Sequence, residues 1–427
     1  MDQRASDRTA DVTTEFERGV VQLLLETMSK VAKEERADVG TESVLNALVS
    51  GDSTAGSAIA PGMRAAGSLG GSIGSRGTSV WVSDDAGDGV VGTPDDEREI
   101  DAFWREVRQE QAKRLRWKNR KKKENENENE GENENEGERE GEGKGKQKSI
   151  ELPPMTGALR SCLRKALESA REEGTLSVHV RHVARALVEL PDTRAREAMM
   201  VEKLDASAAL AALDALRGSD EVPEPGSVLM LRKSGTFGKS GNPLTRKFFA
   251  WVLGGGAGFG SAVVSAVRTE AQRGAVRRGA SESAPVDALL GILALDRSLT
   301  VADRELPEKL TGANQGAELL RRYGARQDAL VRLLLPSTGV AEGEPAEVDG
   351  APEYDRRLLH VTQLTASAQD SPTVGTTHLL AALLDEAGTD AESAAEIERV
   401  LTESGVDVAG LRAEPELQVP GGAARAA

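Results

Sequence analysis

An eleven-residue motif occurs near both ends of this chain and constrains its fold more than any other feature. Residues 39–49 read VGTESVLNALV, and residues 374–384 read VGTTHLLAALL. In both, a Val-Gly-Thr turn precedes apolar residues that are spaced as on one face of an α-helix. Thr41 and Thr376 are suited to cap this helix, because a threonine hydroxyl can accept from free backbone N–H groups. The motif therefore predicts a helix that begins at the turn and buries one face.

Each of these two copies follows another amphipathic segment. Residues 16–35 precede the first copy and residues 354–369 precede the last, both with apolar residues at helical spacing. After the last copy a further helix is expected to end at Gly405, a residue type favoured just beyond helix C-termini. Weaker copies with the same layout occupy residues 158–190 and 259–294. The chain thus contains four degenerate copies of a helix–turn–helix unit.

A single such unit leaves an apolar helix face in water, so we expect the copies to pack in pairs. The predicted fold is all-α, with two pseudo-twofold helical bundles. The first would combine residues 16–70 with residues 157–217, and the second would span residues 259–413. The aromatic content of 3% and the 45 glycines agree with small bundles rather than one large core. The remaining segments are expected to be a disordered insertion, a linker and a loose tail, at residues 71–156, 218–258 and 414–427.

The insertion has two oppositely charged parts. Residues 105–123 carry ten Lys or Arg against two Glu, within a predicted basic helix over 103–123. Residues 124–143 hold ten Glu interleaved with Asn and Gly, a composition that cannot bury apolar area and stays disordered. The basic helix, with Trp104 and Trp117 among its cations, could contact nucleic acid or an acidic partner. The alternative, which we favour, is that the adjacent glutamates neutralise it.

One apolar segment raises the question of a membrane span. Phe248–Val267 is a run of twenty residues without a charge, which is long enough to cross a bilayer. Five glycines within 254–260 dilute its hydrophobicity, so we interpret it as a short apolar helix, a glycine break and the start of the next bundle. No early apolar stretch indicates a signal peptide, and the single Cys162 fits a reducing compartment. A cytoplasmic location is therefore expected.

The motif resembles the core of the Clp N-terminal repeat, or Clp R domain, which reads I-G-T-E-H-L-L-L-x-L-L. The similarity is specific in the first and last copies, moderate in the second and weak in the third, and it covers more than half of the chain. Such repeats open the Clp ATPases of the ClpC, ClpA and ClpB type, where they occur in pairs and bind substrates and adaptors. The resemblance implies an all-α bundle of two four-helix repeats and a protein- or peptide-binding function.

In ClpC-type members, the glutamate of each G-T-E-H motif takes part in recognising phosphorylated arginine. The first copy keeps it as Glu42, and we place Arg181, Asp287 and Thr377 at this position of the other copies. A carboxylate there can hold a guanidinium, while the free N–H groups of the helix start receive a phosphate. With Arg181 opposite Glu42, the first bundle could instead prefer a plain phosphate or an acidic peptide. Another interpretation is that Glu42 and Asp287 are first-turn acids favoured by the helix dipole. The candidate partner-binding residues are Glu42, Asp287, Thr41 and Arg181.

The chain shows no AAA+ ATPase module. Residues 238–240 read Gly-Lys-Ser, as at the end of a phosphate loop, and follow the extended-looking run Val228–Leu231. A phosphate loop needs a glycine where Lys233 stands, since only a flexible backbone curls around the phosphates. We interpret this segment as part of the linker and expect no nucleotide to bind there.

Other catalytic and metal-binding patterns are also missing. Cys162, His179 and His182 do not have the spacing of a metal site, and Cys162 lies among apolar residues, as a buried core cysteine would. His378 occupies the histidine position of the motif and is expected to be structural. We therefore expect no enzyme activity, no metal and no cofactor.

These observations favour a non-catalytic module that binds proteins or peptides, such as substrates, adaptors or other ligands of a Clp protease system. One alternative is an accessory subunit that associates with a Clp ATPase and delivers cargo for proteolysis. Another is a membrane- or nucleic-acid-associated regulator that uses the apolar segment or the basic helix. The net charge of −16 argues against a chain whose whole surface serves nucleic acid.

Overall fold

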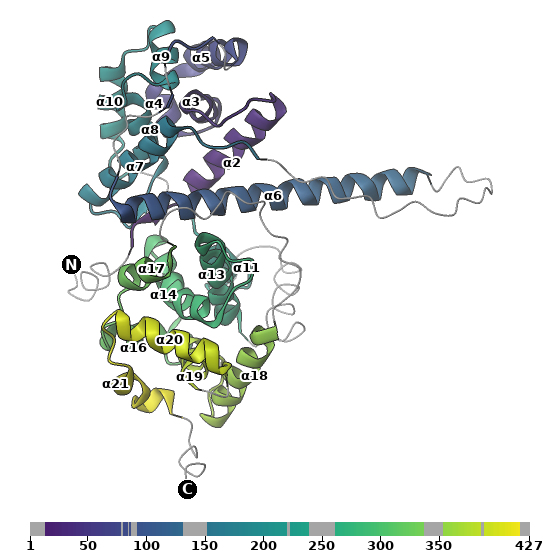
Figure 1. Cartoon of the computed structure of the whole chain (residues 1–427), viewed down its shortest axis with the longest axis vertical. Helices are drawn as coiled ribbons and strands as arrows, with labels where there is room; N and C mark the ends of the chain where they lie inside the picture. The colour runs from purple at the N-terminus through teal and green to yellow at the C-terminus, as the bar shows by residue number, and fades with distance from the viewer. Residues whose placement is uncertain are drawn as a thin grey trace.

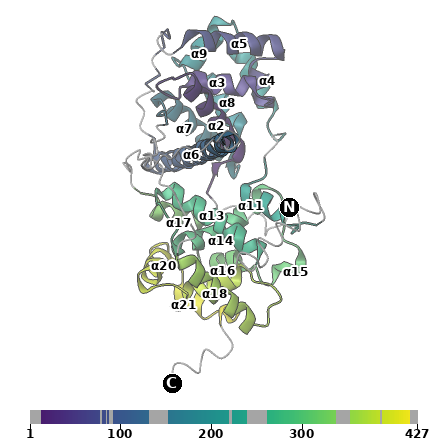
Figure 2. The same cartoon turned by 90° about the vertical axis from the view of Figure 1, so that its right-hand side faces the viewer.

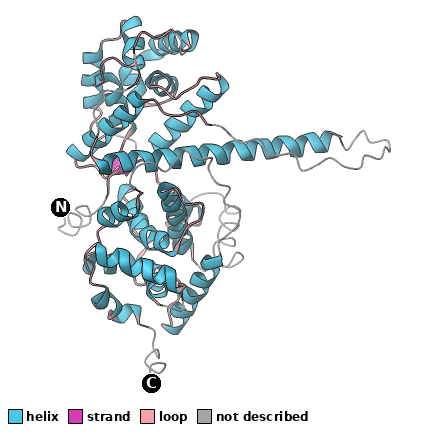
Figure 3. Ribbon diagram, viewed as in Figure 1, coloured by secondary structure: helices cyan, strands magenta, loops and turns pink. Residues whose placement is uncertain are grey.

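The computed structural model of the protein describes residues 13–77, 80–83, 85–86, 92–130, 152–219, 223–238, 261–336, 353–385 and 388–418. Nearly all regular structure in these ranges is helical, which confirms the all-α prediction. The sheet is a short parallel pairing of β1 (Glu15–Phe16) with β2 (Ser177–Val178), shown in magenta in Figure 3. This pairing joins two segments that lie far apart in the sequence.

The helices form two bodies, above and below a long central helix in Figure 1. In the upper, N-terminal body the first motif copy forms α2 (Arg18–Lys33) and α3 (Thr41–Ser50), and the second forms α7 (Gly157–Glu172) and α8 (Val180–Glu189). Both copies contribute to one buried core. The other helices of this body are α4 (Thr54–Ile59), α5 (Gly62–Arg76), α9 (Arg194–Val201) and α10 (Ala206–Ala215).

The lower, C-terminal body has a second core of its own. The third motif copy forms α13 (Ala262–Arg278) and α14 (Pro285–Val301), and the fourth forms α18 (Glu353–Ala368) and α19 (Thr376–Leu384). The other elements are α11 (Gly226–Lys233), α15 (Glu308–Thr311), α16 (Gly316–Arg322), α17 (Gln327–Leu334), α20 (Ala391–Glu403), α21 (Val408–Arg412) and the 3-10 turn η2 (Pro415–Leu417).

Local sequence signals explain several helix boundaries. The hydroxyl of Thr156 accepts from the N–H of Leu159 at 3.2 Å and caps α7, and the carboxylate of Asp390 accepts from the N–H of Ser393 at 2.9 Å and caps α20. Helix α20 ends two residues before Gly405, whose φ of 84° lies in the left-handed region. The prediction of a glycine stop there is confirmed.

Helix α6 (Pro94–Glu130) contains the basic helix predicted over 103–123 and extends it at both ends, into parts of the insertion that were expected to be disordered. It has 37 residues and lies between the two bodies, as Figure 1 shows from the side and Figure 2 nearly end-on. Its N-terminal half forms a helix because apolar residues recur on one face and pack into the N-terminal core. Those buried residues are Ile100, Phe103, Trp104 and Val107. Helix α5 also extends past the predicted boundary, to Arg76. Residues 131–151, with the rest of the Glu-rich tract, lie outside the described ranges.

The linker and tail predictions are also wrong in part. Val228–Leu231, expected to be extended, lies inside α11, and both end residues are buried because three positions along a helix bring them to one face. In the tail, η2 buries Leu417 against the C-terminal core. Lys239 and Ser240 lie outside the described ranges.

The apolar segment Phe248–Val267 is described only from Ser261 onwards. There the hydroxyl of Ser261 accepts from the N–H of Val263 at 3.2 Å and caps α13, whose first residues enter the C-terminal core. None of the helices in the described ranges combines the length and the hydrophobicity that crossing a membrane requires.

Candidate binding sites at the starts of the motif helices

The four motif helices, α3, α8, α14 and α19, share one register. Their N-cap residues are Gly40, His179, Ala284 and Gly375. Counted from these caps, the residues at helical positions four, five, seven and eight are buried in every copy. Position eight is held by Leu48, Leu187, Ile292 and Leu383. The four helices therefore bury the same helical positions.

The third helical residue closes the helix start in three copies. Nδ1 of His182, Nδ1 of His378 and Oδ2 of Asp287 accept from the N–H of their own N-cap residue, at 2.9, 3.0 and 2.7 Å. Asp287 thus corresponds to these histidines and not to Glu42, which is a second helical residue. Our placement of Asp287 at the glutamate position was wrong by one residue, because Pro285 and its neighbours offer no polar cap from which to count.

Thr41 and Thr376 are the first residues of their helices and not the N-caps that the sequence suggested. In each copy the preceding glycine takes the cap position. The hydroxyl of Thr41 donates to Asp85 Oδ1 at 2.9 Å, and the hydroxyl of Thr376 accepts from the N–H of Gly316 at 3.2 Å. These hydroxyls therefore bond to other elements instead of capping their own helix.

A carboxylate of the chain itself occupies the start of α3. Asp85 is 4% exposed and accepts hydrogen bonds through both oxygens. Its Oδ2 accepts from the N–H of Thr41 at 3.2 Å and from the hydroxyl of Thr156 at 2.8 Å, and its Oδ1 also accepts from the N–H of Arg194 at 3.4 Å. The free N–H groups of a helix start favour an anion, and here that anion is internal.

Glu42, the retained motif glutamate, is fully buried beside two arginines. Its Oε1 lies 3.4 Å from Arg36 Nη1 and 3.7 Å from Arg194 Nη1, and it accepts from the hydroxyl of Ser43 at 3.0 Å. Its Oε2 has no hydrogen-bond partner within the described part of the chain. Burial raises the pKa of this carboxyl, although Arg194 acts in the opposite direction. Glu42 is therefore not accessible to a ligand in this conformation.

Arg181 forms its ion pair within its own copy, with Glu173. Its two terminal nitrogens donate to the two carboxylate oxygens of Glu173 at 3.1 and 2.6 Å, and Arg181 is 2% exposed. Nε2 of His182 lies 3.1 Å from the same carboxylate. The hydrogen bonds from Arg181 are the main reason that the pKa of Glu173 falls to about 2, whereas burial lowers the pKa of His182. The expected role of Arg181 as a cation facing Glu42 is corrected by this pairing.

Asp287 is engaged by Arg278, whose Nε and Nη2 donate to its two oxygens at 3.1 and 2.8 Å. In the fourth copy, the N–H of Thr377 donates to the carbonyl oxygen of Ala313 at 3.1 Å. In three copies an ion pair joins the motif helix to the end of the preceding helix or to the turn after it: Arg36–Glu42, Glu173–Arg181 and Arg278–Asp287. All four motif-helix starts are therefore closed by groups of the chain.

The cysteine and the motif histidines have structural surroundings. Cys162 is fully buried, its Sγ lies 3.7 Å from the carbonyl oxygen of Val183, and burial raises the pKa of the thiol, which disfavours the thiolate. His182 and His378 use Nδ1 to close their helices. Among the described residues, no three His, Cys, Asp or Glu side chains are grouped so that they could hold a metal ion.

Sequence reasoning missed a buried ion cluster between the bodies. Arg277 of α13 donates to both oxygens of Glu99 in α6 at 2.7 Å, and Arg273 donates to Glu106 at 2.9 Å and to Glu15 at 2.6 Å. Burial alone would raise the pKa of Glu15, but the neighbouring guanidinium groups hold it well below its usual range. The sequence does contain a matching pattern: Arg273 and Arg277 are four residues apart, and Glu99 and Glu106 are seven residues apart. This pattern predicts a contact only when the position of α6 is known. A cleft of about 350 Å³ lies beside this cluster, between α2, α6 and α13.

Comparison with known protein families, with characterised proteins and with solved structures found no match. The fold alone defines the class of this protein: it is an all-α protein of two bodies with a long helix between them.

Proposed function

We propose that this protein is a non-catalytic module that binds proteins or peptides, built from two double repeats of the Clp N-terminal type. The shared register of the four motif helices carries the proposal. All four bury the same positions, and three close their N-terminus with the third residue. Copies of one duplicated repeat would share these features, whereas unrelated helix pairs would not.

The packing of the copies supports a pseudo-twofold arrangement in each body. In the N-terminal body α8 contacts both α2 and α3, and in the C-terminal body α19 contacts both α13 and α14. Each copy thereby covers the apolar face of the other. The proposed repeat domains are residues 16–70 with 157–217, and residues 259–413.

Binding without turnover is supported by the state of the reactive side chains. A buried thiol with a raised pKa is a poor nucleophile. Nδ1 of each motif histidine accepts from a backbone N–H, so in the neutral ring Nε2 carries the proton and does not serve as a general base. We therefore propose binding without turnover, by a protein located in the cytoplasm.

The closed helix starts favour a protein surface as the ligand over free phosphoarginine. The family's ligand would need the N–H groups of α3, which Asp85 occupies, and Glu42, which is buried. Thr41, Arg181 and Asp287 also have internal partners. We propose that Glu42, Thr41, Arg181 and Asp287 hold the repeats together in this conformation. An anion would then reach the start of α3 only after Asp85 leaves it.

Calorimetric titration of the full chain tests this proposal. Phosphoarginine and an acidic peptide are expected not to bind the unchanged protein at the α3 start. In an Asp85→Ala variant the N–H of Thr41 becomes available, and weak binding of phosphoarginine is expected there. Glu42→Ala serves as the control, since it leaves Asp85 in place. Tight phosphoarginine binding that Glu42→Ala abolishes would contradict the closed-site account.

The alternative is an accessory subunit that delivers cargo to a Clp ATPase. The two interpretations differ in what the chain does to proteolysis. An accessory subunit accelerates degradation of a bound cargo by a purified Clp ATPase and its peptidase, whereas a competing module slows it. Measuring the degradation rate of a model substrate with and without the full chain distinguishes them.

A further inference from the structure

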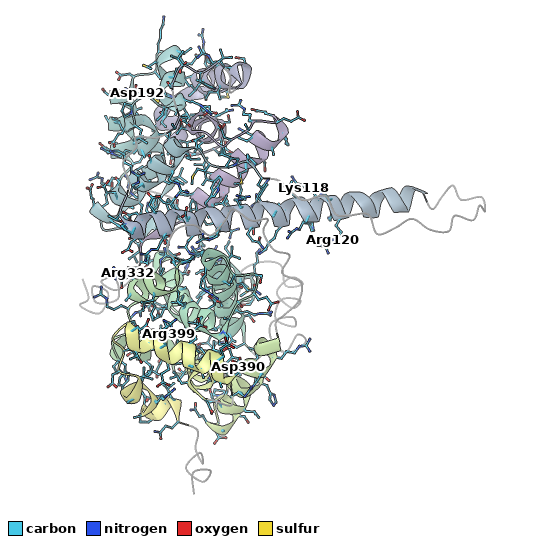
Figure 4. All side chains as sticks on the ribbon, in the orientation of Figure 1. Lys118, Arg120, Asp192, Arg332, Asp390 and Arg399 are labelled. Carbon is cyan, nitrogen blue, oxygen red and sulfur yellow. The ribbon has the colours of Figure 1, made fainter. Side chains whose placement is uncertain are left out.

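The C-terminal half of α6 leaves the two bodies and carries a dense positive charge. We call residues 113–121 the basic stalk; they include six Lys or Arg and no acid. Lys113, Arg114 and residues 117–121 are exposed. Figures 1 and 4 show the helix continuing well beyond both bodies. At a rise of 1.5 Å per residue, the exposed residues 117–121 extend about 7.5 Å along the helix axis.

The cations of the basic stalk point in several directions. Lys118 and Arg120 leave the helix on opposite sides in Figure 4, as residues two apart should. Nζ of Lys121 lies 4.4 Å from the ring centroid of Trp117, a side chain that is 52% exposed. Besides Trp117, Leu115 is the other large apolar residue of the stalk. A continuous apolar face, which a helix lying on a membrane requires, is therefore not built by these residues.

The glutamates that follow begin on the same helix. Helix α6 continues to Glu130, so the backbone of residues 124–130 extends along the helix axis, away from the stalk. Neutralisation of the stalk by its own chain and binding of an external partner are distinguished by removing these glutamates, as the test below does.

We propose that the basic stalk binds double-stranded DNA by entering the major groove. A helix with its side chains is about 10–12 Å across, and the major groove of B-DNA is about 12 Å wide. Both walls of the groove carry phosphates, so a helix in the groove can pair cations on opposite sides with phosphates. The surface of an acidic protein would contact the cations on one side of the helix only. The net charge of −16 keeps DNA away from the rest of the molecule.

The test is a titration of a fluorescent DNA duplex of about 20 base pairs with the full chain, followed by anisotropy at several salt concentrations. Neutralising about five phosphates predicts that affinity falls about 500-fold between about 50 and 200 mM salt. Deleting residues 124–143 is expected to strengthen binding, because it removes ten Glu next to the stalk.

Two variants of equal charge locate the contact. The stalk variant carries Arg114→Gln, Lys118→Gln, Arg120→Gln and Lys121→Gln. The control carries four substitutions of exposed C-terminal-body arginines, Arg322→Gln, Arg326→Gln, Arg399→Gln and Arg412→Gln. Glutamine keeps the helix, so circular dichroism should not change. The stalk variant is expected to bind at least about tenfold more weakly, with a lower salt dependence, and the control within about twofold of the unchanged protein.

Three results would overturn the proposal. One is that neither the full chain nor the 124–143 deletion binds the duplex. Another is that the stalk variant and the control lose affinity equally. The third is that a polyglutamate peptide binds the stalk while DNA does not, which would assign the stalk to an acidic protein partner.

Discussion

At the start of α3, Asp85 takes the place that a bound anion would have in an open site. Asp85→Ala would remove the carboxylate that accepts from four donors: the N–H groups of Thr41 and Arg194 and the hydroxyls of Thr41 and Thr156. We expect a loss of about 2–4 kcal/mol in the free energy of unfolding, measured in urea. Asp52→Ala, at an exposed position, is the control and should change it by less than about 0.5 kcal/mol. Equal effects of the two changes would show that Asp85 does not hold the helix start.

Replacing Glu42 by glutamine should not destabilise the fold as Asp85→Ala does, because burial raises the pKa of the Glu42 carboxyl. A raised pKa means that the fold favours the protonated form; this stabilisation is present below the ordinary carboxyl pKa and is lost as pH rises through the folded value. At pH 7 Glu42→Gln keeps the shape and removes a buried charge, while Arg36 and Arg194 keep Glu34 and Asp38 as partners. The melting temperature at pH 7 is therefore expected to stay the same or rise by about 2–4 °C. A fall of that size would show that the carboxylate charge itself is needed.

At the scale of single elements, α6 combines a core helix and an exposed stalk in one continuous helix. Phe103 is fully buried and stacks on Phe16 with ring centroids 4.1 Å apart. Phe103→Ala should lower the free energy of unfolding by about 3–5 kcal/mol, because it leaves a cavity in the N-terminal core. Trp117→Ala, on the exposed half, is the matched control and should change it by less than about 0.5 kcal/mol. Chemical unfolding of both variants measures the difference, and similar losses would mean that the insertion is not part of the core.

The elements that the sequence predicted well are those with a repeated apolar pattern. The motif helices and the helices before them were expected because apolar residues such as Leu48, Leu187 and Leu383 recur at the same position of each motif, and all three are buried. Helix α6 was only partly expected, since its charge hid the face that Phe103 occupies. The role of Asp85 could not be predicted: it follows a Gly- and Ser-rich stretch, and its partners come from three separate segments. Long-range polar contacts of this kind leave no local pattern in a single sequence.

At the scale of the whole molecule, the two bodies meet through buried charges around α6. Oε2 of Glu15 accepts a hydrogen bond from Arg273 and lies 3.6 Å from Nη1 of Arg297; both arginines belong to the C-terminal body. Because its pKa is depressed, its stabilising effect is present above the ordinary carboxyl pKa of about 4.3 and is lost as pH falls below it. Glu15→Gln should lower the free energy of unfolding by about 3 kcal/mol at pH 7, and the deficit should shrink between pH 5 and pH 3.

The control for this prediction is Glu403→Gln, which breaks an exposed pair with Arg399. We would measure the free energy of unfolding in urea at a series of pH values. For the control, this free energy should change with pH in parallel with that of the unchanged protein. If the Glu15→Gln curve is parallel as well, Glu15 does not contribute to the pH dependence of the contact between the bodies.

The central proposal is that the paired repeats bind ligands of a Clp protease system and do not themselves catalyse a reaction. The degradation rate of a model substrate by a purified ClpC-type ATPase and its peptidase, measured over a series of concentrations of the full chain, tests this most directly. The account predicts that the rate falls as the chain is added and recovers when the substrate is in excess. A rate that does not change, or that rises, at every chain concentration tested would contradict the account.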